Sequence, residues 1–478
     1  MRVCLIIPPC GFLLDERVFP SLGVLKVAAV LERTPIDVKV WDFSGYSERE
    51  MAACIQRSDP ADMFGITATM PQMPAAAQIA RHLKNRYPTT RLILGGPHVT
   101  LLHASAKQER ARGMDSRACA AMRELHALFD VLVCGDGEHA IGIAVSAHPP
   151  TLIDADDPQT TLFLTKADLN AAPLAARHLI DLDSYHYAID GHKTHSLIGQ
   201  LGCPMGCAFC GGRRSPFLRR VRTRTTANVV AEVRHLHEAY GATGFMFLDD
   251  ELNVNRQFMD LLGQLSDLQS DLGVAFVFRG LLKSELLTDP MAAAMARTGF
   301  RQILVGFESG SERMLLNMRK NATRDDNTRC VETLRRHGIA VKALMSFGHA
   351  GESRHTIAET RAWLLEVQPD DFDVTIITVY PGTPYYDDAV ESSPGVWTYT
   401  DPKNGDRLHA LPVDHLRDVN FYKGIPGEYQ SFVYTDTLTR EDLVHWRDVV
   451  ESDVRHRLHI PFPTSHVEHR YEHSMGMR

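Results

Sequence analysis

The chain has 478 residues, of which 44% are hydrophobic and 23% are charged, and its formal net charge is −8. This length exceeds one ordinary core, and the composition is typical of a folded protein. The acidic balance argues against a sequence-independent nucleic-acid binder, which needs a basic surface to displace counterions. No apolar run reaches membrane-span length, the amino-terminal run is too short for a signal peptide, and the nine cysteines are mostly scattered. We therefore expect a cytoplasmic protein with no disulfide framework, no membrane span and no bound nucleic acid.

Residues 1–145 alternate short apolar runs with helical patterns, which is typical of parallel βαβ units. Strands are expected at 3–7, 38–42, 63–66, 91–94 and 131–134, with helices such as 23–31 and 75–84 between them. These elements predict a Rossmann-like or flavodoxin-like sheet.

The loops that follow these strands are the candidate ligand contacts, because parallel sheets bind ligands at the carboxyl ends of their strands. They contain Thr67, Thr69, Gly95, Gly96, Pro97, His98, Gly135, Gly137 and Glu138. None of the loops carries a G-x-G-x-x-G fingerprint, so a dinucleotide domain is not supported. His98 is a candidate metal ligand, although histidines in turns are more often hydrogen-bonded or exposed.

Periodicity weakens over residues 146–194, where prolines and an acidic patch interrupt the pattern. We interpret this segment as an interdomain linker.

Three cysteines then occur at C-x3-C-x2-C spacing: Cys203, Cys207 and Cys210. Thiolates this close can face one point and bind a soft metal centre such as an iron–sulfur cluster. A cubane cluster with three protein ligands keeps one iron open. A structural zinc site is the alternative, but it needs a fourth ligand, and the nearest later cysteine is the isolated Cys330.

From residue 195 to 386 the βα alternation resumes, with strands expected at 196–200, 244–248, 274–278, 302–307, 341–347 and 372–379. Helical patterns such as 227–239, 258–268 and 356–365 lie between them. Six such units predict a partial barrel whose active groups lie at the carboxyl ends of its strands. That rule selects Asp249 to Glu251 after the second strand, Arg279 after the third, Glu308, Ser309 and Gly310 after the fourth, and His349 to Glu352 after the fifth. The acids at 249–251 are equally well explained as helix caps.

An arginine-rich stretch follows the third cysteine, and a mixed extension occupies residues 387–478. The arginines could contact an anionic ligand or form ordinary surface salt bridges. The extension contains a predicted helix at 441–457 and aromatic residues that could cover a substrate cavity or pack in the core. These aromatic residues are Tyr422, Tyr429, Phe432 and Tyr434.

The cysteine motif, with Phe209 just before its third cysteine, resembles the hallmark of the radical S-adenosylmethionine (SAM) superfamily. The resemblance implies that the three cysteines hold a [4Fe-4S] cluster whose open iron is chelated by SAM. It also implies SAM contacts from Phe209 and the barrel strand ends at Asp249, Glu251, Arg279, Glu308 and Ser309. The family further implies an electron donor such as flavodoxin or ferredoxin.

The amino-terminal domain, with Gly-Gly-Pro-His and Gly-x-Gly-Glu turns before such a core, resembles the cobalamin-binding radical SAM class. In that class the strand-end loops contact cobalamin, and here they are the loops listed above for the first sheet. The D-x-H-x-x-G motif that supplies an axial histidine in many cobalamin proteins is absent. A domain that keeps this fold without the cofactor is the alternative.

The resemblance implies a methyltransferase that acts on an unactivated carbon of a small molecule or natural-product intermediate. The deoxyadenosyl radical would take a hydrogen atom from the substrate, and cobalamin would supply the methyl group. A non-methylating enzyme of the same architecture, such as an oxidative cyclase, is the main alternative. A methylthiotransferase is disfavoured because the other cysteines form no second tight cluster. A cobalamin- or redox-sensing binding protein would not cleave SAM.

Overall fold

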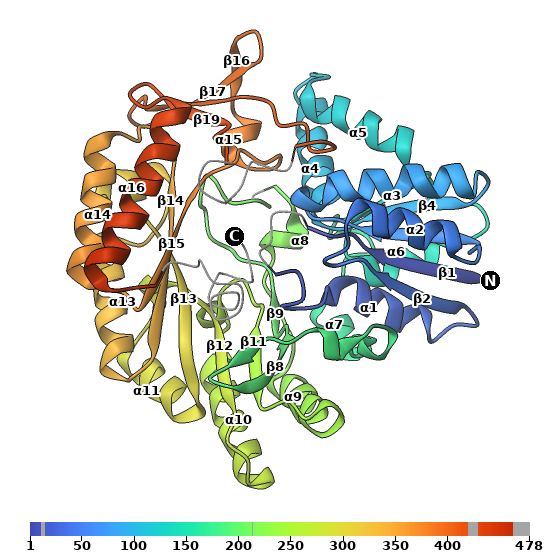
Figure 1. Cartoon of the computed structure of the whole chain (residues 1–478), viewed down its shortest axis with the longest axis horizontal. Coiled ribbons are helices and arrows are strands. Elements are labelled where there is room, and N and C mark those ends of the chain that lie inside the picture. The colour runs from blue at the N-terminus through green and yellow to red at the C-terminus, as the bar shows by residue number, and fades with distance from the viewer. Residues whose placement is uncertain (11–14, 213, 419–428, 462–478) are drawn as a thin grey trace.

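The computed structural model describes residues 1–10, 15–212, 214–418 and 429–461. An open parallel sheet and a curved half-barrel lie side by side, and a small antiparallel sheet with one long helix follows them in the chain (Figure 1). The predicted fold class is confirmed. In the described part of the chain, no helix is both long enough and apolar enough to cross a membrane.

The amino-terminal sheet has six parallel strands in the order β2-β1-β3-β4-β5-β6. The strands are β1 (Arg2–Ile7), β2 (Asp37–Asp42), β3 (Met63–Thr67), β4 (Arg91–Gly95), β5 (Val131–Gly135) and β6 (Leu152–Ala155). The first five agree with the sequence prediction. β6 was not predicted as a strand, because its four residues lie among loop-forming residues in the expected linker. The strand order reverses between β1 and β3, and sheets of this order bind ligands at that point.

Helices cover both faces of this sheet. One face carries α1 (Leu22–Leu31) and α6 (Gly137–Ala144). The other carries α2 (Glu48–Arg57), α3 (Met73–Arg86), α4 (Pro97–Ala111) and α5 (Arg117–Leu128). Because both faces are covered, the strands read as continuous apolar runs, and residues 3–7 of β1 are at most 2% exposed.

The connection to the half-barrel contains α7 (Lys166–Ala171) and two single 3₁₀ turns, Arg177–Leu179 and Leu182–Ser184. Its end forms β7 (Ala188–Ile189), which pairs antiparallel with the first barrel strand. The linker prediction therefore covers a segment that adds a strand to each sheet.

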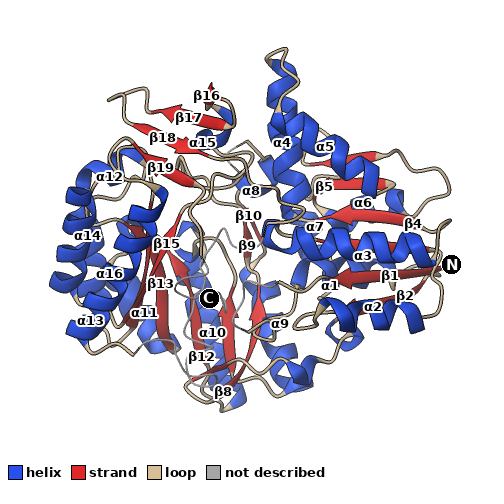
Figure 2. Cartoon of the chain, turned by 45° about the horizontal axis from the view of Figure 1, so that its top comes forward, coloured by secondary structure: helices blue, strands red, loops and turns tan. Residues whose placement is uncertain are grey.

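Six parallel strands form the half-barrel, as predicted: β8 (His192–Leu197), β11 (Gly244–Phe247), β12 (Val277–Leu282), β13 (Phe300–Glu308), β14 (Ala340–Phe347) and β15 (Asp371–Ile376). The outer face is covered by α9 (Thr226–Tyr240), α10 (Phe258–Leu272), α11 (Asp289–Thr298), α12 (Glu312–Asn317), α13 (Arg324–Arg336) and α14 (Arg354–Val367), as Figure 2 shows. Inside, a small apolar cluster joins the strands to two segments from outside the barrel, at Val18 and Tyr187.

The last part of the described chain forms an antiparallel sheet and a helix. The elements are α15 (Pro384–Asp387), β16 (Val390–Ser393), β17 (Val396–Thr400), β18 (Arg407–Ala410), β19 (Val433–Thr435) and α16 (Arg440–Leu458). The helix agrees with the sequence prediction and packs on α14 and β15. The sheet was not predicted, because its strands have only three to five residues and β16 is fully exposed.

Candidate active site

Two cavities lie at the carboxyl ends of the two parallel sheets. The strand-end cavity has a volume of about 290 Å³ and is formed mainly by β1, β3, β4 and β5 with α1 and α6. The second, which we call the thiol-loop cavity, has a volume of about 300 Å³ and lies at the ends of β13, β14 and β15. The thiol loop, residues 202–212, contains the three predicted cluster cysteines and contributes Phe209, Cys210 and Gly211 to the second cavity.

The strand-end cavity brings together the predicted ligand contacts of the first sheet. Those that line it are Thr67, Thr69, Gly95, Gly96, Pro97, Gly135, Gly137 and Glu138. Its remaining wall is mostly apolar and includes Leu5, Ile93 and Val133. Gly96 has φ +104°, and an added Cβ there would lie 2.8 Å from the backbone of Ala68. The glycines thus let backbone, rather than side chains, form the wall, so a ligand can approach the backbone closely there.

His98 does not line this cavity. It is 3% exposed, its ring packs edge-on against His415 at 5.4 Å between centroids, and its Nδ1 atom has no hydrogen-bond partner. Burial lowers the pKa of His98 well below its usual value, with His415 acting in the same direction. The ring is therefore neutral, and its role as a metal ligand stays a prediction.

Some polar residues of the cavity were missed from the sequence, among them Lys26 and Gln72. Lys26 of α1 lines it, and burial lowers the pKa of this lysine, against the opposing charge of Glu138. Gln72 also lines it and accepts hydrogen bonds from Thr69 while donating to the Pro8 carbonyl at 2.9 Å. Both lie outside the strand-end turns, so the strand-end rule did not select them.

Backbone hydrogen bonds anchor the thiol loop near its start and in its middle. The short strand β9 (Gln200–Leu201) precedes the loop. It pairs with β10 (Arg222–Thr223), which follows the short helix α8 (Pro216–Arg219) in the chain. The Cys203 amide donates to the Leu218 carbonyl at 3.0 Å, and the Ala208 amide donates to the Met318 carbonyl at 2.8 Å. These bonds hold the loop between α8 and the end of α12.

The donor set of the loop suits a soft cluster. All three thiols are free; Cys207 is buried, Cys203 is half-buried and Cys210 is exposed. Burial raises the pKa of Cys203 to about 11, and the negative charges of Glu251 and Cys207 act in the same direction. Thiolates at this place therefore need a strongly positive centre to stabilise them, as a cluster of irons does. Among the described residues, no three His, Cys, Asp or Glu side chains are arranged to hold a single metal ion.

Glu308 lies at the end of β13 and lines the thiol-loop cavity with Phe209. Its backbone is left-handed, with φ +66°. Its Oε1 atom lies 3.1 Å from Lys320 Nζ, and its Oε2 atom accepts from Ser346 Oγ at 2.7 Å. Although burial opposes ionisation, Lys320 and Ser346 hold the pKa of Glu308 below its usual value. An ionised carboxylate therefore faces the cavity beside Cys210.

Asp249 performs a structural task. Its carboxylate is 1% exposed and accepts a 2.7 Å hydrogen bond from the Gly199 amide, just before the thiol loop. Burial raises its pKa to about 7 despite the amides of Gly199 and Gln200. Its contact with SAM stays a prediction, because this oxygen is directed at the backbone of the loop entry.

Glu251 and Ser309 differ in their surroundings. Burial raises the pKa of Glu251 to about 7, against the opposing charges of Lys320 and Lys283, and its Oε2 atom is buried without a hydrogen-bond partner. This orphaned oxygen is available to a cationic ligand group. Ser309 instead packs into the barrel wall, where its Oγ lies 2.9 Å from Thr360 Oγ1. Neither residue lines the described thiol-loop cavity.

Arg279 does not follow the third barrel strand, as the sequence suggested, but lies inside it. β12 begins at Val277 rather than Val274, so the strand runs through Arg279 to Leu282. The buried guanidinium donates to the Tyr187 hydroxyl near the apolar cluster inside the barrel. The expectation of an arginine at the barrel mouth was wrong, because an apolar run does not fix where a strand begins.

Most of the arginine-rich stretch forms internal contacts. Arg222 pairs with the buried Asp136, Arg224 pairs with Glu232, and Arg214 lies 3.6 Å from Asp388. All three therefore form salt bridges, but only that of Arg214 lies at the surface as the alternative expected, because Arg222 and Arg224 are buried. Arg213 and Tyr422 lie outside the described residues. The other aromatic residues that were expected to cover a substrate cavity do not line the thiol-loop cavity. They are Tyr429, Phe432 and Tyr434.

Two family models match the chain. That of the Radical SAM superfamily matches residues 197–364, and that of the B12 binding domain matches residues 16–125. The first covers the thiol loop and most of the half-barrel, and the second covers most of the strand-end loops.

The curated relatives include a methyltransferase and a cyclase. The chain is 26% identical over 415 residues to an uncharacterized methyltransferase of Pyrococcus horikoshii, with 82% of this chain and 84% of that protein covered. It is 22% identical over 374 residues to an anaerobic magnesium-protoporphyrin IX monomethyl ester cyclase of Rubrivivax gelatinosus. That alignment covers 75% of this chain and 63% of the cyclase.

Solved structures share the fold over most of this chain. The radical SAM methyltransferase TsrM from Kitasatospora setae, with cobalamin and a [4Fe-4S] cluster bound, matches with a TM-score of 0.61 at 17% identity. The match covers 85% of this chain and 81% of that chain. The cobalamin-dependent radical enzyme OxsB matches with a TM-score of 0.56 at 14% identity, covering 76% of this chain and 51% of OxsB. At these identities the likeness establishes the fold.

Proposed function

The chain belongs to the cobalamin-binding class of radical SAM enzymes, and we propose that it is a methyltransferase acting on an unactivated carbon of a small molecule. The resemblance stated from the sequence is confirmed by the two family models together. The cofactors of this class are a [4Fe-4S] cluster, SAM and cobalamin.

One observation carries the proposal: a single segment borders both cavities. Ile198, Leu201 and Phe217 line the strand-end cavity, while residues 209–211 of the same segment line the thiol-loop cavity. A methyl donor in the first cavity and a substrate radical in the second would be separated by little more than this loop. The names of the methyltransferase relative and of TsrM support the same reaction.

When bound, the cluster and SAM supply one-electron bond cleavage, and cobalamin supplies the methyl group. The residues that would hold the cluster are Cys203, Cys207 and Cys210. Phe209 and Glu308 would contact SAM, and Glu251 would accept from its ammonium group, because an ionised carboxylate suits a cation. The strand-end glycine loops would contact cobalamin through their backbone.

The thiol-loop cavity, with its volume of about 300 Å³, suits a small molecule or a natural-product intermediate. A tryptophan complex of TsrM supports this class of substrate. We also propose a reducing, cytoplasmic setting with flavodoxin or ferredoxin as electron donor, because all nine cysteines are free thiols.

The test is anaerobic reconstitution with iron, sulfide and hydroxocobalamin, followed by incubation with methyl-labelled SAM, a reductant and a metabolite extract. We expect about four irons and one cobalamin per chain, and a new small molecule that carries the label. A chain in which all three cysteines are changed to alanine should retain cobalamin but lose the iron and the labelled product.

The cyclase relative supports a second function, an oxidative ring closure without methyl transfer. A new product without the label, formed by the loaded enzyme, would establish this second function and reject the first. SAM that stays intact under reducing conditions with the extract would reject both.

A further inference from the structure

A chain of buried hydrogen bonds ends on the carboxylate of Glu308. Ser346 Oγ lies 2.7 Å from Glu308 Oε2 and 2.9 Å from His349 Nε2. His349 Nδ1 lies 3.4 Å from the Tyr385 hydroxyl. Ser346, His349 and Tyr385 are at most 4% exposed, so water does not compete for these bonds.

The direction of the chain follows from its end. An ionised carboxylate only accepts hydrogen bonds, so the Ser346 hydroxyl must donate to Glu308. That hydroxyl then accepts from His349, which places the ring proton on Nε2. Nδ1 accepts from the Tyr385 hydroxyl, whose oxygen in turn accepts from the Ala350 amide. Every member thus has one orientation.

The same histidine also touches the thiol loop. Its ring meets Phe209 edge-to-face, with 5.0 Å between centroids and 72° between planes. His349 follows β14 directly, while Tyr385 begins the extension after the barrel. Burial lowers the pKa of His349 to about 3, so the ring stays neutral and keeps its single proton.

On the opposite side, Glu308 Oε1 is held by Lys320 at 3.1 Å. Each carboxylate oxygen can accept two hydrogen bonds. Both oxygens of Glu308 can therefore accept a further hydrogen bond from a ligand in the cavity that Glu308 lines. The left-handed backbone of Glu308 is a conformation that neighbouring contacts must maintain.

We propose that His349 is a positioning residue of the SAM site: through Ser346 it fixes the plane of the Glu308 carboxylate against the ligand. The inference rests on the proposed function for the identity of that ligand. His349 itself does not touch the ligand; it acts through the Ser346 hydroxyl. The ligand groups recognised are hydrogen-bond donors, an ammonium or a sugar hydroxyl.

Two amide variants of His349 separate positioning from packing. In His349→Gln the amide nitrogen reaches the place of Nε2 and can still donate to Ser346. In His349→Asn the shorter amide corresponds to Nδ1 and cannot reach Ser346. The variants remove the same ring, and they differ in the bond that the proposal requires.

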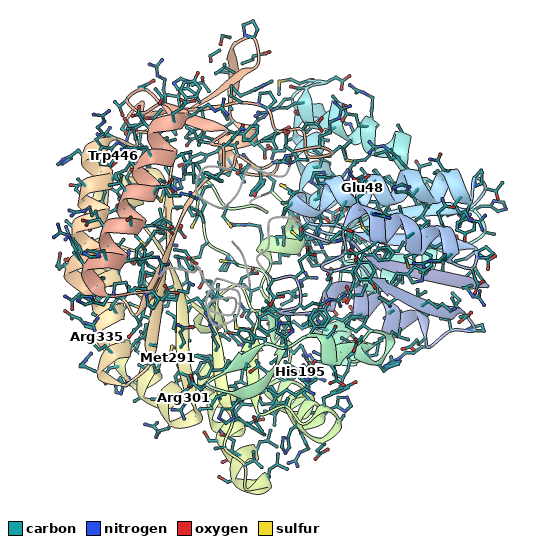
Figure 3. All side chains as sticks on the ribbon, viewed as in Figure 1. Glu48, His195, Met291, Arg301, Arg335 and Trp446 are labelled. Atoms are coloured by element: carbon teal, nitrogen blue, oxygen red, sulfur yellow. The ribbon has the colours of Figure 1, made fainter. Side chains whose placement is uncertain are left out.

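The experiment measures the Kd for SAM of each reconstituted holoenzyme by equilibrium binding, with iron and cobalamin content as folding checks. We expect a Kd within about threefold of the parent for His349→Gln and about tenfold or more weaker for His349→Asn, because a carboxylate of Glu308 that is no longer held in place forfeits about one hydrogen bond to a charged ligand group. Ser346→Ala should resemble the asparagine variant. The matched control is His195, a buried histidine on β8 that lines neither cavity and is labelled in Figure 3. Its glutamine and asparagine variants should bind SAM equally well.

Equal Kd values for His349→Gln and His349→Asn, or an unchanged Kd for Ser346→Ala, would overturn the proposal while leaving the function intact. Failure of the parent holoenzyme to bind SAM would instead reject the proposed function.

Discussion

At the scale of the single residue, glycine at position 96 is required by the backbone of the strand-end cavity. Its φ of +104° lies in the region that other residues avoid, and an added Cβ would lie 2.8 Å from Ala68 and 2.9 Å from Thr67 Oγ1. The turn after β4 therefore has to move if any side chain is added there.

We predict that Gly96→Ala lowers the amount of cobalamin retained per chain after desalting at least tenfold. Strain of about 1–3 kcal/mol from a backbone conformation that is essentially restricted to glycine, plus the contact, displaces the wall that the cofactor would touch. The matched control is Gly113→Ala, because Gly113 has φ +72° but nothing within 4 Å of an added Cβ. Equal retention by the two variants would show that this turn does not contact cobalamin.

His195 makes the stability of the half-barrel depend on pH. Burial lowers its pKa to about 4, with Arg177 and Lys193 acting in the same direction. The unfolded chain therefore binds more protons than the folded chain between pH 4 and 6.5, so stability rises with pH through this window and is complete above it.

We predict that His195→Phe, which keeps a ring against Tyr240, loses less stability on acidification than the parent. The contribution at stake is at most about 3 kcal/mol, from a shift of about 2.5 pKa units. Thermal midpoints measured at pH 7.5 and pH 5.0 check this. An equal fall of the thermal midpoint in both proteins would show that groups other than His195 cause the pH dependence.

The sequence gives the type of each residue, and the type limits the chemistry that the residue can perform. The sequence does not show which other residues it contacts. The three cysteines and the glycine turns were predictable, because spacing and residue type alone limit what they can do. Arg279 was misplaced, and the bonds that join Ser346, His349 and Tyr385 to Glu308 were invisible. They connect strands and turns that only the curvature of the sheet brings together.

At the scale of the element, the entry to the thiol loop depends on one carboxylate. Asp249, just after β11, accepts from Gly199 between β8 and β9, and so ties two neighbouring strand ends together. A buried hydrogen bond contributes about 1 kcal/mol, and leaving the buried amides unpaired would cost about 1–3 kcal/mol more.

We predict that Asp249→Ala reduces the iron bound per chain at least severalfold, whereas Asp249→Asn, which keeps an acceptor oxygen, retains most of it. Asp267→Ala, at an exposed position of α10, serves as the control. Iron and sulfide counts after reconstitution give the answer. Full iron content in Asp249→Ala would mean that Ala208 and Cys203 anchor the loop unaided.

Element boundaries follow from tertiary pairing more than from local pattern. The run from Val274 to Leu282 is apolar apart from Arg279 and Gly280, so its periodicity permits several start points. Pairing with β11 and β13 selects Val277. The strand β6 also could not be located from local pattern. Its four residues form a strand only because the edge of β5 is open for pairing.

At the scale of the whole molecule, the extension after the barrel joins the two cofactor domains. Arg117 of α5 lies between the rings of Tyr386 and Trp397, with its guanidinium carbon 3.5 and 3.9 Å from their centroids. Arg112 donates to the Asp387 carbonyl at 2.5 Å and pairs with Asp388 at 2.8 Å. The amino-terminal sheet is thus fixed to a segment that follows the last barrel strand.

This junction matters because the two cavities share one loop. If the first sheet moves, the wall of the strand-end cavity formed by Ile198, Leu201 and Phe217 moves away from the glycine turns. The thiol loop itself is held by the Met318 carbonyl at the end of α12 and by the Leu218 carbonyl of α8, neither of which belongs to this junction. Loosening the junction should therefore lower the amount of cobalamin bound without changing the amount of iron bound.

We predict that Arg117→Ala accelerates amide hydrogen exchange in residues 117–128 and 384–400 and lowers cobalamin retention severalfold, while iron content stays at the parental value. Each cation–π contact contributes about 0.5–2 kcal/mol, and the alanine removes both. Arg123→Ala on the same helix is the matched control, because Arg123 is exposed and pairs only locally with Asp115. Faster exchange with unchanged cobalamin would show that the strand-end cavity holds the cofactor without help from the barrel. Parallel loss of iron and cobalamin would show instead that the two cofactor domains fold as one cooperative unit.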